Sequence, residues 1–181
     1  IPFLFAAYKC ESIDQPPSFH SFIGTPKKDP RKQFALHLIE KCSNVNSILV
    51  YDPMTEKKVI RGLIREFPEY VVELEIIISK IIDLAIPIRN KQFYLPAMKG
   101  LSSMKHVLPA VDASNNYNSL SVQSGRAASQ LYQILCDEHH DRNEEQELYN
   151  LIEYCKMDVY GLVQVYNAFL KALGRPIVSF N

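Results

Sequence analysis

The segment that most constrains the fold is a short apolar run that leads directly into a helical pattern. Residues 47–51 (SILVY) form a continuously apolar stretch, typical of a strand buried inside an α/β sheet. Asp52-Pro53 ends this run, and apolar residues then fall at helical spacing through residues 55–67. A buried strand followed by an amphipathic helix is the building unit of α/β domains, so the sequence predicts that fold class.

The other segments fit the same class. Residues 1–9 and 18–23 are rich in aromatic and β-favouring residues, which predicts an antiparallel pair of strands. Asp29-Pro30 is a start signal for a helix that runs to about residue 41. Further elements are expected as follows: a helix over 68–79, a strand over 81–86, an extended piece over 93–95, a helix over 101–108 closed by Pro109, a loop over 112–121, and helices from 124 and over 144–173.

The last of these helices carries a long apolar stripe. Its members alternate steps of four and three residues: Leu148, Ile152, Cys155, Val159, Leu162, Tyr166, Phe169 and Leu173. This stripe is expected to pack against the sheet or against neighbouring helices.

Composition excludes several classes of protein. With 181 residues, 47% of them hydrophobic, the chain suits a single domain with its own core and not a disordered segment. Twenty Lys and Arg balance twenty Asp and Glu, so the chain is not a strongly basic nucleic-acid binder. No stretch approaches the roughly 18 apolar residues of a membrane helix, so no membrane is expected as a partner. The four cysteines lie far apart, which indicates reduced thiols in a cytoplasmic protein.

The charges are unevenly distributed along the chain. Residues 84–111 contain four basic side chains and no acid, whereas residues 137–153 contain seven acids and one arginine. Two ordinary solvated faces would explain this pattern. The functional alternative is a basic groove beside an acidic, metal-binding rim.

Two acids stand at the ends of predicted strands. Glu56 follows the strand over 47–51, and sites in open α/β sheets collect at the carboxyl ends of strands. Glu56 is equally suited to stabilise the first turn of its helix through the helix dipole. Asp83 interrupts the apolar run IISKIIDLAIPI, where a buried charge needs an ion pair, hydrogen bonds or a metal. A capping acid at the strand end is the alternative for Asp83.

A third acid and a phenol share one face of the last helix. Tyr154 and Asp158 are four residues apart and therefore lie one above the other. An acid supplies a hard oxygen ligand for a metal, and a phenol can orient an attacking water. Such a pair is also common on helices without any catalytic role.

The two adjacent histidines, His139-His140, lie in an acidic turn and have no third metal ligand at a familiar spacing.

The order of these elements, together with three motifs, resembles a known family. The motifs are P-A-M-K-G at 96–100, S-x-K-x-V-L-P at 103–109 and Y-x-x-L-x-x-Q-x-G-x-x-A at 117–128. The chain resembles, over nearly its whole length, family 2779 of the bacterial domains of unknown function, a relative of the DEDD exonucleases. The resemblance implies a ribonuclease H-like mixed sheet flanked by helices.

The resemblance also implies a metal site. DEDD enzymes use four carboxylates to hold two divalent cations, Mg²⁺ or Mn²⁺, for phosphodiester hydrolysis. Glu56 matches the acid of the second motif, although Asp52 and Thr55 stand where that family usually has Asn and Phe. Asp158 matches the acid of the third motif, in which Tyr154 gives the Y-x-x-x-D variant. Asp83 matches a recurrent family acid.

The first motif, Asp-x-Glu on the first strand, does not occur near Ile1. The resemblance places that strand at the centre of the sheet, between the hairpin and residues 47–51. Residues 1–181 are therefore expected to form a single incomplete domain of a longer protein. An Asp-x-Glu in the sequence upstream of Ile1 would support this expectation. The upstream parent chain would supply the first strand, and the fragment alone is expected to bind metal weakly and to be inactive.

The function expected of the complete domain is metal-dependent 3′–5′ exonuclease activity on a DNA or RNA end. Its catalytic residues would be Tyr154, Glu56 and Asp158, with Glu56, Asp158 and Asp83 as metal ligands. The expected phosphate contacts are Lys99, Lys105 and Arg126. The alternative is a non-catalytic nucleic-acid-binding or scaffolding module of the same fold, and a third reading is an unrelated α/β domain.

Overall fold

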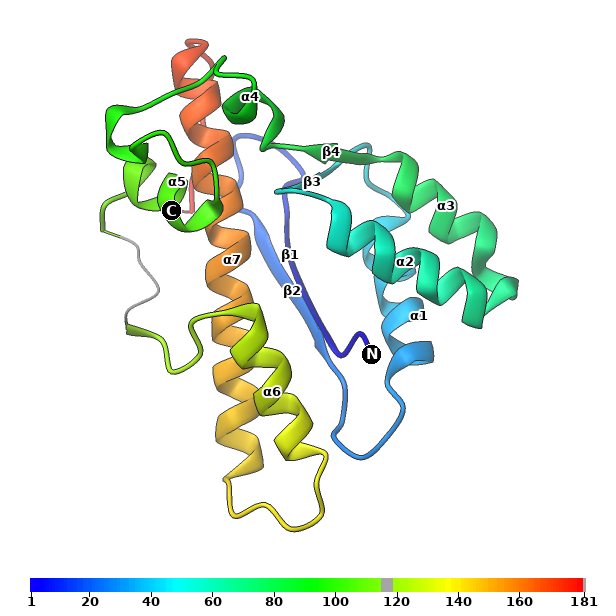
Figure 1. Cartoon of the computed structure of the whole chain (residues 1–181). Helices are drawn as coiled ribbons and strands as arrows, with labels where there is room; N and C mark the ends of the chain where they lie inside the picture. The colour runs from blue at the N-terminus through cyan, green and yellow to red at the C-terminus, as the bar shows by residue number, and fades with distance from the viewer. Residues whose placement is uncertain (115–118, 181) are drawn as a thin grey trace.

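The computed structural model describes residues 1–114 and 119–180. Within them it shows a mixed α/β fold with two small sheets and seven α-helices (Figure 1). Two short 3₁₀ helices are labelled η. The elements in chain order are β1 (Leu4–Lys9), β2 (Ser18–Ile23), α1 (Arg31–Cys42), β3 (Ile48–Val50), α2 (Met54–Glu66), η1 (Pro68–Tyr70), α3 (Val71–Ser79), β4 (Ile81–Asp83), α4 (Ile86–Arg89), η2 (Pro96–Met98), α5 (Met104–Val111), α6 (Gly125–Leu135) and α7 (Glu144–Ala172).

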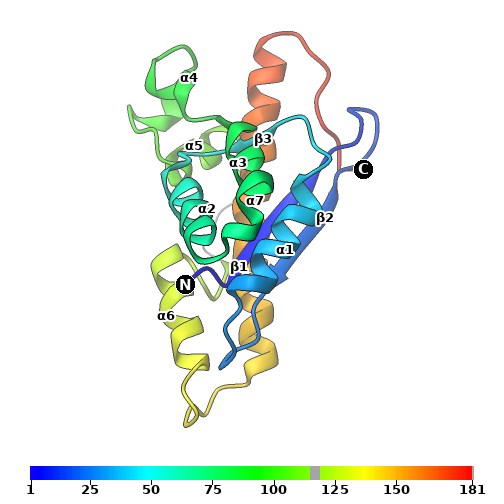
Figure 2. The ribbon, with the colours of Figure 1, turned by 90° about the vertical axis from the view of Figure 1, so that its right-hand side faces the viewer.

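β1 and β2 form the predicted antiparallel pair, in a register that sets Leu4 opposite Ile23. Side chains alternate between the two faces of the pair. Phe5 and Phe22 pack edge-on against Phe34 of α1, while Leu4 and Ile23 pack toward α6 and α7. The hairpin is therefore covered by α1 on one face and by α7 on the other, as Figure 2 shows.

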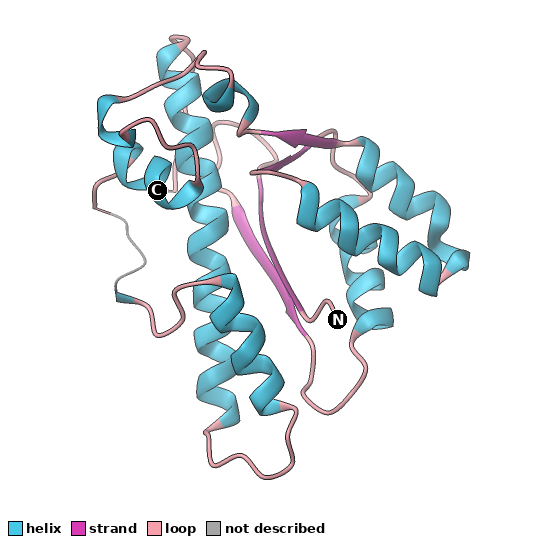
Figure 3. Cartoon of the chain, viewed as in Figure 1, coloured by secondary structure: helices cyan, strands magenta, loops and turns pink. Residues whose placement is uncertain are grey.

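The second sheet is a parallel pair of β3 and β4, in which Val50 lies opposite Asp83. In the described part of the chain no ladder joins this pair to the hairpin (Figure 3).

The outer edge of β1 is met by α7. Hydrogen-bonded and non-bonded pairs alternate in an antiparallel ladder. The Gly24 amide donates to the Phe3 carbonyl, so Phe3 and Gly24 form a hydrogen-bonded pair. By alternation Ala6 and Ser21 form a non-bonded pair, and the Ala6 amide therefore points away from β2, toward the open edge of β1. There it donates to the thiol of Cys155 on α7.

The predicted helix over 55–67 is confirmed as α2, and its stripe builds a core with α1 and α3. Ile60 and Leu63 are buried beside Phe34, Leu74 and Ile77. The helices stay together because each contributes an apolar stripe that none of them can bury alone. This core fixes the start of α2, and with it the position of Glu56.

α7 is confirmed as one long helix, but none of its fully buried residues belongs to the predicted stripe, whose members are half-buried or exposed. Leu151 and Val165 are fully buried, whereas Leu173 is 73% exposed. The helix contacts β1, α5 and α6 at different heights, so more than one side of it is covered. Among the described residues, none of the helices, α7 included, has the length and apolar character needed to cross a membrane.

Three predicted boundaries were wrong. The strand over 81–86 ends at Asp83, because the chain turns there into α4. The helix over 101–108 instead spans Met104–Val111 and contains Pro109. Pro109 removes one helical hydrogen bond, which is tolerated because α5 ends only two residues later. Of the predicted loop over 112–121, residues 115–118 lie outside the described residues.

Gly24 offers a test of how the hairpin is anchored. Its carbonyl accepts a hydrogen bond of 3.1 Å from the buried Tyr132 hydroxyl. A Cβ at this position would lie 2.4 Å from Pro30 Cβ and 2.9 Å from the Tyr132 oxygen. Gly24→Ala is therefore expected to lower the free energy of unfolding by about 2 kcal/mol, measured by urea denaturation.

Gly62→Ala is the matched control for Gly24→Ala. Gly62 lies inside α2, where an added Cβ would lie 4.0 Å from the Arg65 guanidinium. Alanine there is expected to stabilise the helix by roughly 0.5–1 kcal/mol. If both alanine variants had the same stability, the close approach at Gly24 would not constrain the fold.

Candidate functional site

Acidic side chains from four separate segments meet around Glu56, in the first turn of α2. Glu56 keeps part of its side chain exposed, yet desolvation by the surrounding protein is the largest cause that raises its pKa. The negative charges of Asp52, Asp83 and Asp158 raise it further. Asp52 and Asp83 lie at the carboxyl ends of β3 and β4, and Asp158 lies on α7. The fold thus brings together the three acids that the sequence singled out, with Asp52 as a fourth.

Asp83 is the most fully engaged of these acids. Its side chain is only 9% exposed. Its Oδ1 accepts hydrogen bonds from the backbone N–H groups of Asp52, at 3.0 Å, and Ala85, at 2.8 Å. Its Oδ2 is paired with the guanidinium of Arg89. Asp83 therefore ties the ends of β3 and β4 to α4, which includes the capping role considered from the sequence.

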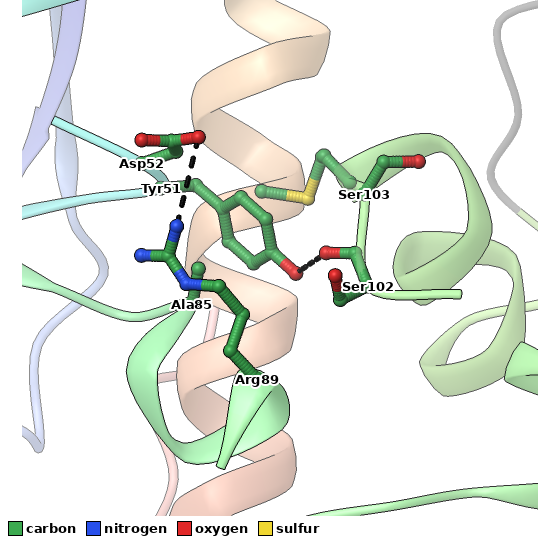
Figure 4. A pocket seen from close by; sticks show the side chains of 7 residues that line it. Tyr51, Asp52, Ala85, Arg89, Ser102 and Ser103 are labelled. Atoms are coloured by element: carbon green, nitrogen blue, oxygen red, sulfur yellow. Dashed lines mark hydrogen bonds and ion pairs between the residues drawn. The ribbon is translucent and has the colours of Figure 1, made fainter. Parts of the chain in front are cut away.

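Arg89 connects two acids of the cluster. Besides Asp83, its guanidinium lies 3.7 Å from the Asp52 carboxylate, as Figure 4 shows. Arg89 and Asp52 line a pocket of about 270 Å³, whose opposite wall is formed by Ser102 and Ser103. The Tyr51 hydroxyl donates to the Ser102 carbonyl across this pocket. The pocket thus connects the acid cluster to the start of α5.

Tyr154 and Asp158 lie on one face of α7, as their spacing predicted, and the Tyr154 hydroxyl is hydrogen-bonded to the Asp158 carboxylate. Burial is the largest cause that raises the pKa of Tyr154, and the charge of Asp158 and the hydrogen bond to it raise it further. The phenol therefore stays protonated at neutral pH and donates to Asp158. Burial also raises the pKa of the neighbouring Cys155 thiol to about 12, so this thiol is a structural group and no nucleophile.

The predicted phosphate contacts lie on the surface next to this pair. Lys99, Lys105 and Arg126 are all exposed. Lys105 donates at 3.2 Å to the carbonyl of Gln123, just before α6. A Cβ on Gly125, the residue before Arg126, would lie 3.9 Å from the Tyr154 hydroxyl oxygen. The start of α6 therefore lies close to the Tyr154 hydroxyl, and Lys105 of α5 reaches the segment just before α6.

Among residues 1–114 and 119–180, no three His, Cys, Asp or Glu side chains are placed to hold one ion. The chemistry of the donors agrees with this, because Asp83 uses its oxygens on two amides and Arg89.

The raised pKa of Glu56 predicts a pH dependence of stability. An acid whose pKa is raised by folding binds its proton more tightly in the folded state, so its ionised form opposes folding. This cost is absent below the unfolded pKa near 4.5 and grows as the pH rises through the raised folded value. Glu56→Gln is therefore expected to be more stable than the native chain at pH 7.5 and equally stable at pH 4.

Urea denaturation at both pH values would measure this difference. Glu75→Gln, an exposed acid on α3, is the matched control and is expected to change stability equally little at either pH. A native chain that is more stable than Glu56→Gln at pH 7.5 would contradict the assignment of Glu56 to a desolvated, acid-rich setting.

Sequence reasoning missed the part played by Arg89. This residue was noted only as one of the basic side chains in residues 84–111. A signal existed, because an acid inside an apolar run needs a partner and Arg89 is the first basic residue after Asp83. The separation of six residues, with Pro87 between them, is not a helical pairing, so spacing alone did not indicate the contact.

Comparison with known families assigns the amino-terminal part of the chain. Residues 1–103 match the model of a family described as Domain of unknown function (DUF2779). The match is shorter than the expected resemblance and contains Glu56 and Asp83, while Tyr154 and Asp158 lie beyond it. No curated protein and no solved structure matches the chain. The expected bacterial origin and cytoplasmic location stay predictions.

Proposed function

The chain belongs to this family of domains of unknown function, and we propose that it is the larger part of a DEDD-type nuclease domain with a ribonuclease H-like fold. The complete domain would hydrolyse phosphodiester bonds at the 3′ end of DNA or RNA with Mg²⁺ or Mn²⁺. The observation that carries the proposal is the meeting of Asp52, Glu56, Asp83 and Asp158 in one place. Their positions at strand ends and on α7 favour a functional cluster.

The two separate sheets support a further strand in the complete protein. β1 pairs only with β2, and β3 only with β4, among the described strands. In the proposal, a strand from polypeptide that precedes Ile1 lies between β1 and β3 and contributes two more carboxylates. It would displace the contact of the Ala6 amide with Cys155, the group that now meets this edge of β1.

The roles proposed for this chain's own residues follow from their settings. Glu56 and Asp158 would hold metal together with the added carboxylates, and Asp83 would join them only if it left Arg89. The metal would activate water and stabilise the leaving oxygen. Tyr154 would position that water through its protonated hydroxyl. Lys99, Lys105 and Arg126 would contact phosphates, where positive charge supplies most of the affinity.

The test is nuclease activity of a polypeptide that includes the sequence upstream of Ile1. With millimolar Mn²⁺, it is expected to shorten a 5′-labelled single-stranded oligonucleotide stepwise from its 3′ end, on DNA or RNA. EDTA is expected to stop the reaction. A purified, folded polypeptide that leaves both oligonucleotides intact at every metal concentration would refute the nuclease.

One observation favours a second function, a non-catalytic nucleic-acid-binding or scaffolding module of the same fold. Arg89 already pairs with both Asp52 and Asp83, which leaves fewer carboxylates for metal. Calorimetric titration with Mn²⁺ separates the two functions, because the longer polypeptide should bind the metal only if it is a nuclease. Oligonucleotide binding that is unchanged by EDTA would support the module.

A further inference from the structure

Asp83 is a buried carboxylate whose charge is balanced within the fold. The side chain is 9% exposed, and a carboxylate in that setting is strongly unfavourable unless it is paired and hydrogen-bonded. Two backbone amides satisfy one oxygen, and Arg89 pairs with the other. Removing Arg89 would leave the Asp83 carboxylate without its ion pair. Removing Asp83 would leave the two backbone amides without their hydrogen-bond acceptor.

Arg89 stands where a cation bridging Asp83 and Asp52 would stand. Asp52 adopts a left-handed backbone with φ of 60°, which directs its N–H to Asp83. Its carboxylate lies 3.7 Å from the same guanidinium. Arg89 thus touches the ends of both parallel strands from α4, and its side chain is 42% exposed rather than deeply buried. A partly exposed group of this kind can be removed without leaving a large cavity.

We propose that Arg89 is the built-in counter-ion of this acid cluster and excludes divalent cations from Asp83 and Asp52. The fold then needs no metal at this end of the β3–β4 sheet. The inference concerns the chain as it stands and does not require nuclease activity. It refines the proposed function by removing Asp83 and Asp52 from the residues that would hold metal while Arg89 is in place.

The experiment compares Mn²⁺ binding by the 181-residue chain and its variants, by calorimetric titration in buffer treated with chelator. Arg89→Gln is expected to bind Mn²⁺ at least about tenfold more tightly than the native chain, because Asp83 and Asp52 lose their counter-ion. The double variant Arg89→Gln/Asp83→Asn is expected to lose this gain. Arg65→Gln, which removes an exposed charge near the end of α2, is the matched control and should bind as the native chain does.

Two results would overturn the inference. One is an Arg89→Gln chain that binds Mn²⁺ no more tightly than Arg65→Gln. The other is a native chain whose Mn²⁺ affinity falls on Asp83→Asn, because Asp83 would then be a ligand while Arg89 is present. Both readouts are metal affinities, so an inactive but folded longer polypeptide would refute the nuclease and leave this inference standing.

A folding defect in Arg89→Gln would supply its own measurement. If the variant is unfolded in EDTA, millimolar Mn²⁺ is expected to restore the helical circular dichroism of the native chain. Sodium chloride of equal ionic strength should not restore it. Recovery specific to Mn²⁺ supports the inference, and no recovery contradicts it.

Discussion

Replacing Asp158 by asparagine is expected to lower the rate of oligonucleotide hydrolysis by the complete protein by roughly 10²–10³-fold. Losses of this size follow when a group that stabilises transition-state charge is removed. Asparagine has the shape of aspartate and can still accept the hydrogen bond from Tyr154, so the packing of α7 should be kept. The change therefore removes one negative charge beside Glu56 and little else.

Steady-state rates at saturating Mn²⁺, with the melting temperature as a check on folding, would measure the effect of Asp158→Asn. Asp141→Asn is the matched control, because Asp141 is an exposed acid in the turn between α6 and α7. It is expected to keep full activity. Equal rates for the two variants would exclude Asp158 from the reaction and, with it, the DEDD assignment of α7.

Replacing Asp83 by alanine is expected to lower the free energy of unfolding by about 3 kcal/mol, the low end for breaking a buried ion pair. The low end applies because Arg89 is partly exposed and can be solvated once its partner is lost. The amides of Asp52 and Ala85 would also lose their shared acceptor. The ends of β3 and β4 are therefore expected to separate before the rest of the fold.

Urea denaturation measures this loss, and Asp83→Asn separates its two causes. The asparagine carbonyl can accept from both amides but cannot pair with Arg89 as a charge, so its cost is expected to be about half that of alanine. If Asp83→Ala cost less than about 1 kcal/mol, Asp83 would be an ordinary surface acid and the account of Arg89 as its counter-ion would fail as well.

Local pattern predicted the elements better than it predicted their ends. The hairpin, α2 and α7 were recognisable because alternation and helical spacing are properties of neighbouring residues. The end of β4 at Asp83 and the start of α5 at Met104 were missed. Both boundaries are set by contacts with distant segments: Asp83 accepts from Asp52, and the Tyr51 hydroxyl reaches Ser102.

The candidate site divides in the same way. The sequence by itself singled out three acids: Glu56 after a strand end, Asp83 inside an apolar run and Asp158 one helical turn from Tyr154. A charge inside an apolar run needs a partner, but only the tertiary structure decided what each acid contacts. In the folded chain Asp83 forms an ion pair with Arg89 and accepts a hydrogen bond from the Asp52 amide. The tertiary structure set Asp158 beside Glu56, from segments about a hundred residues apart, because α7 crosses the molecule next to the ends of the strands.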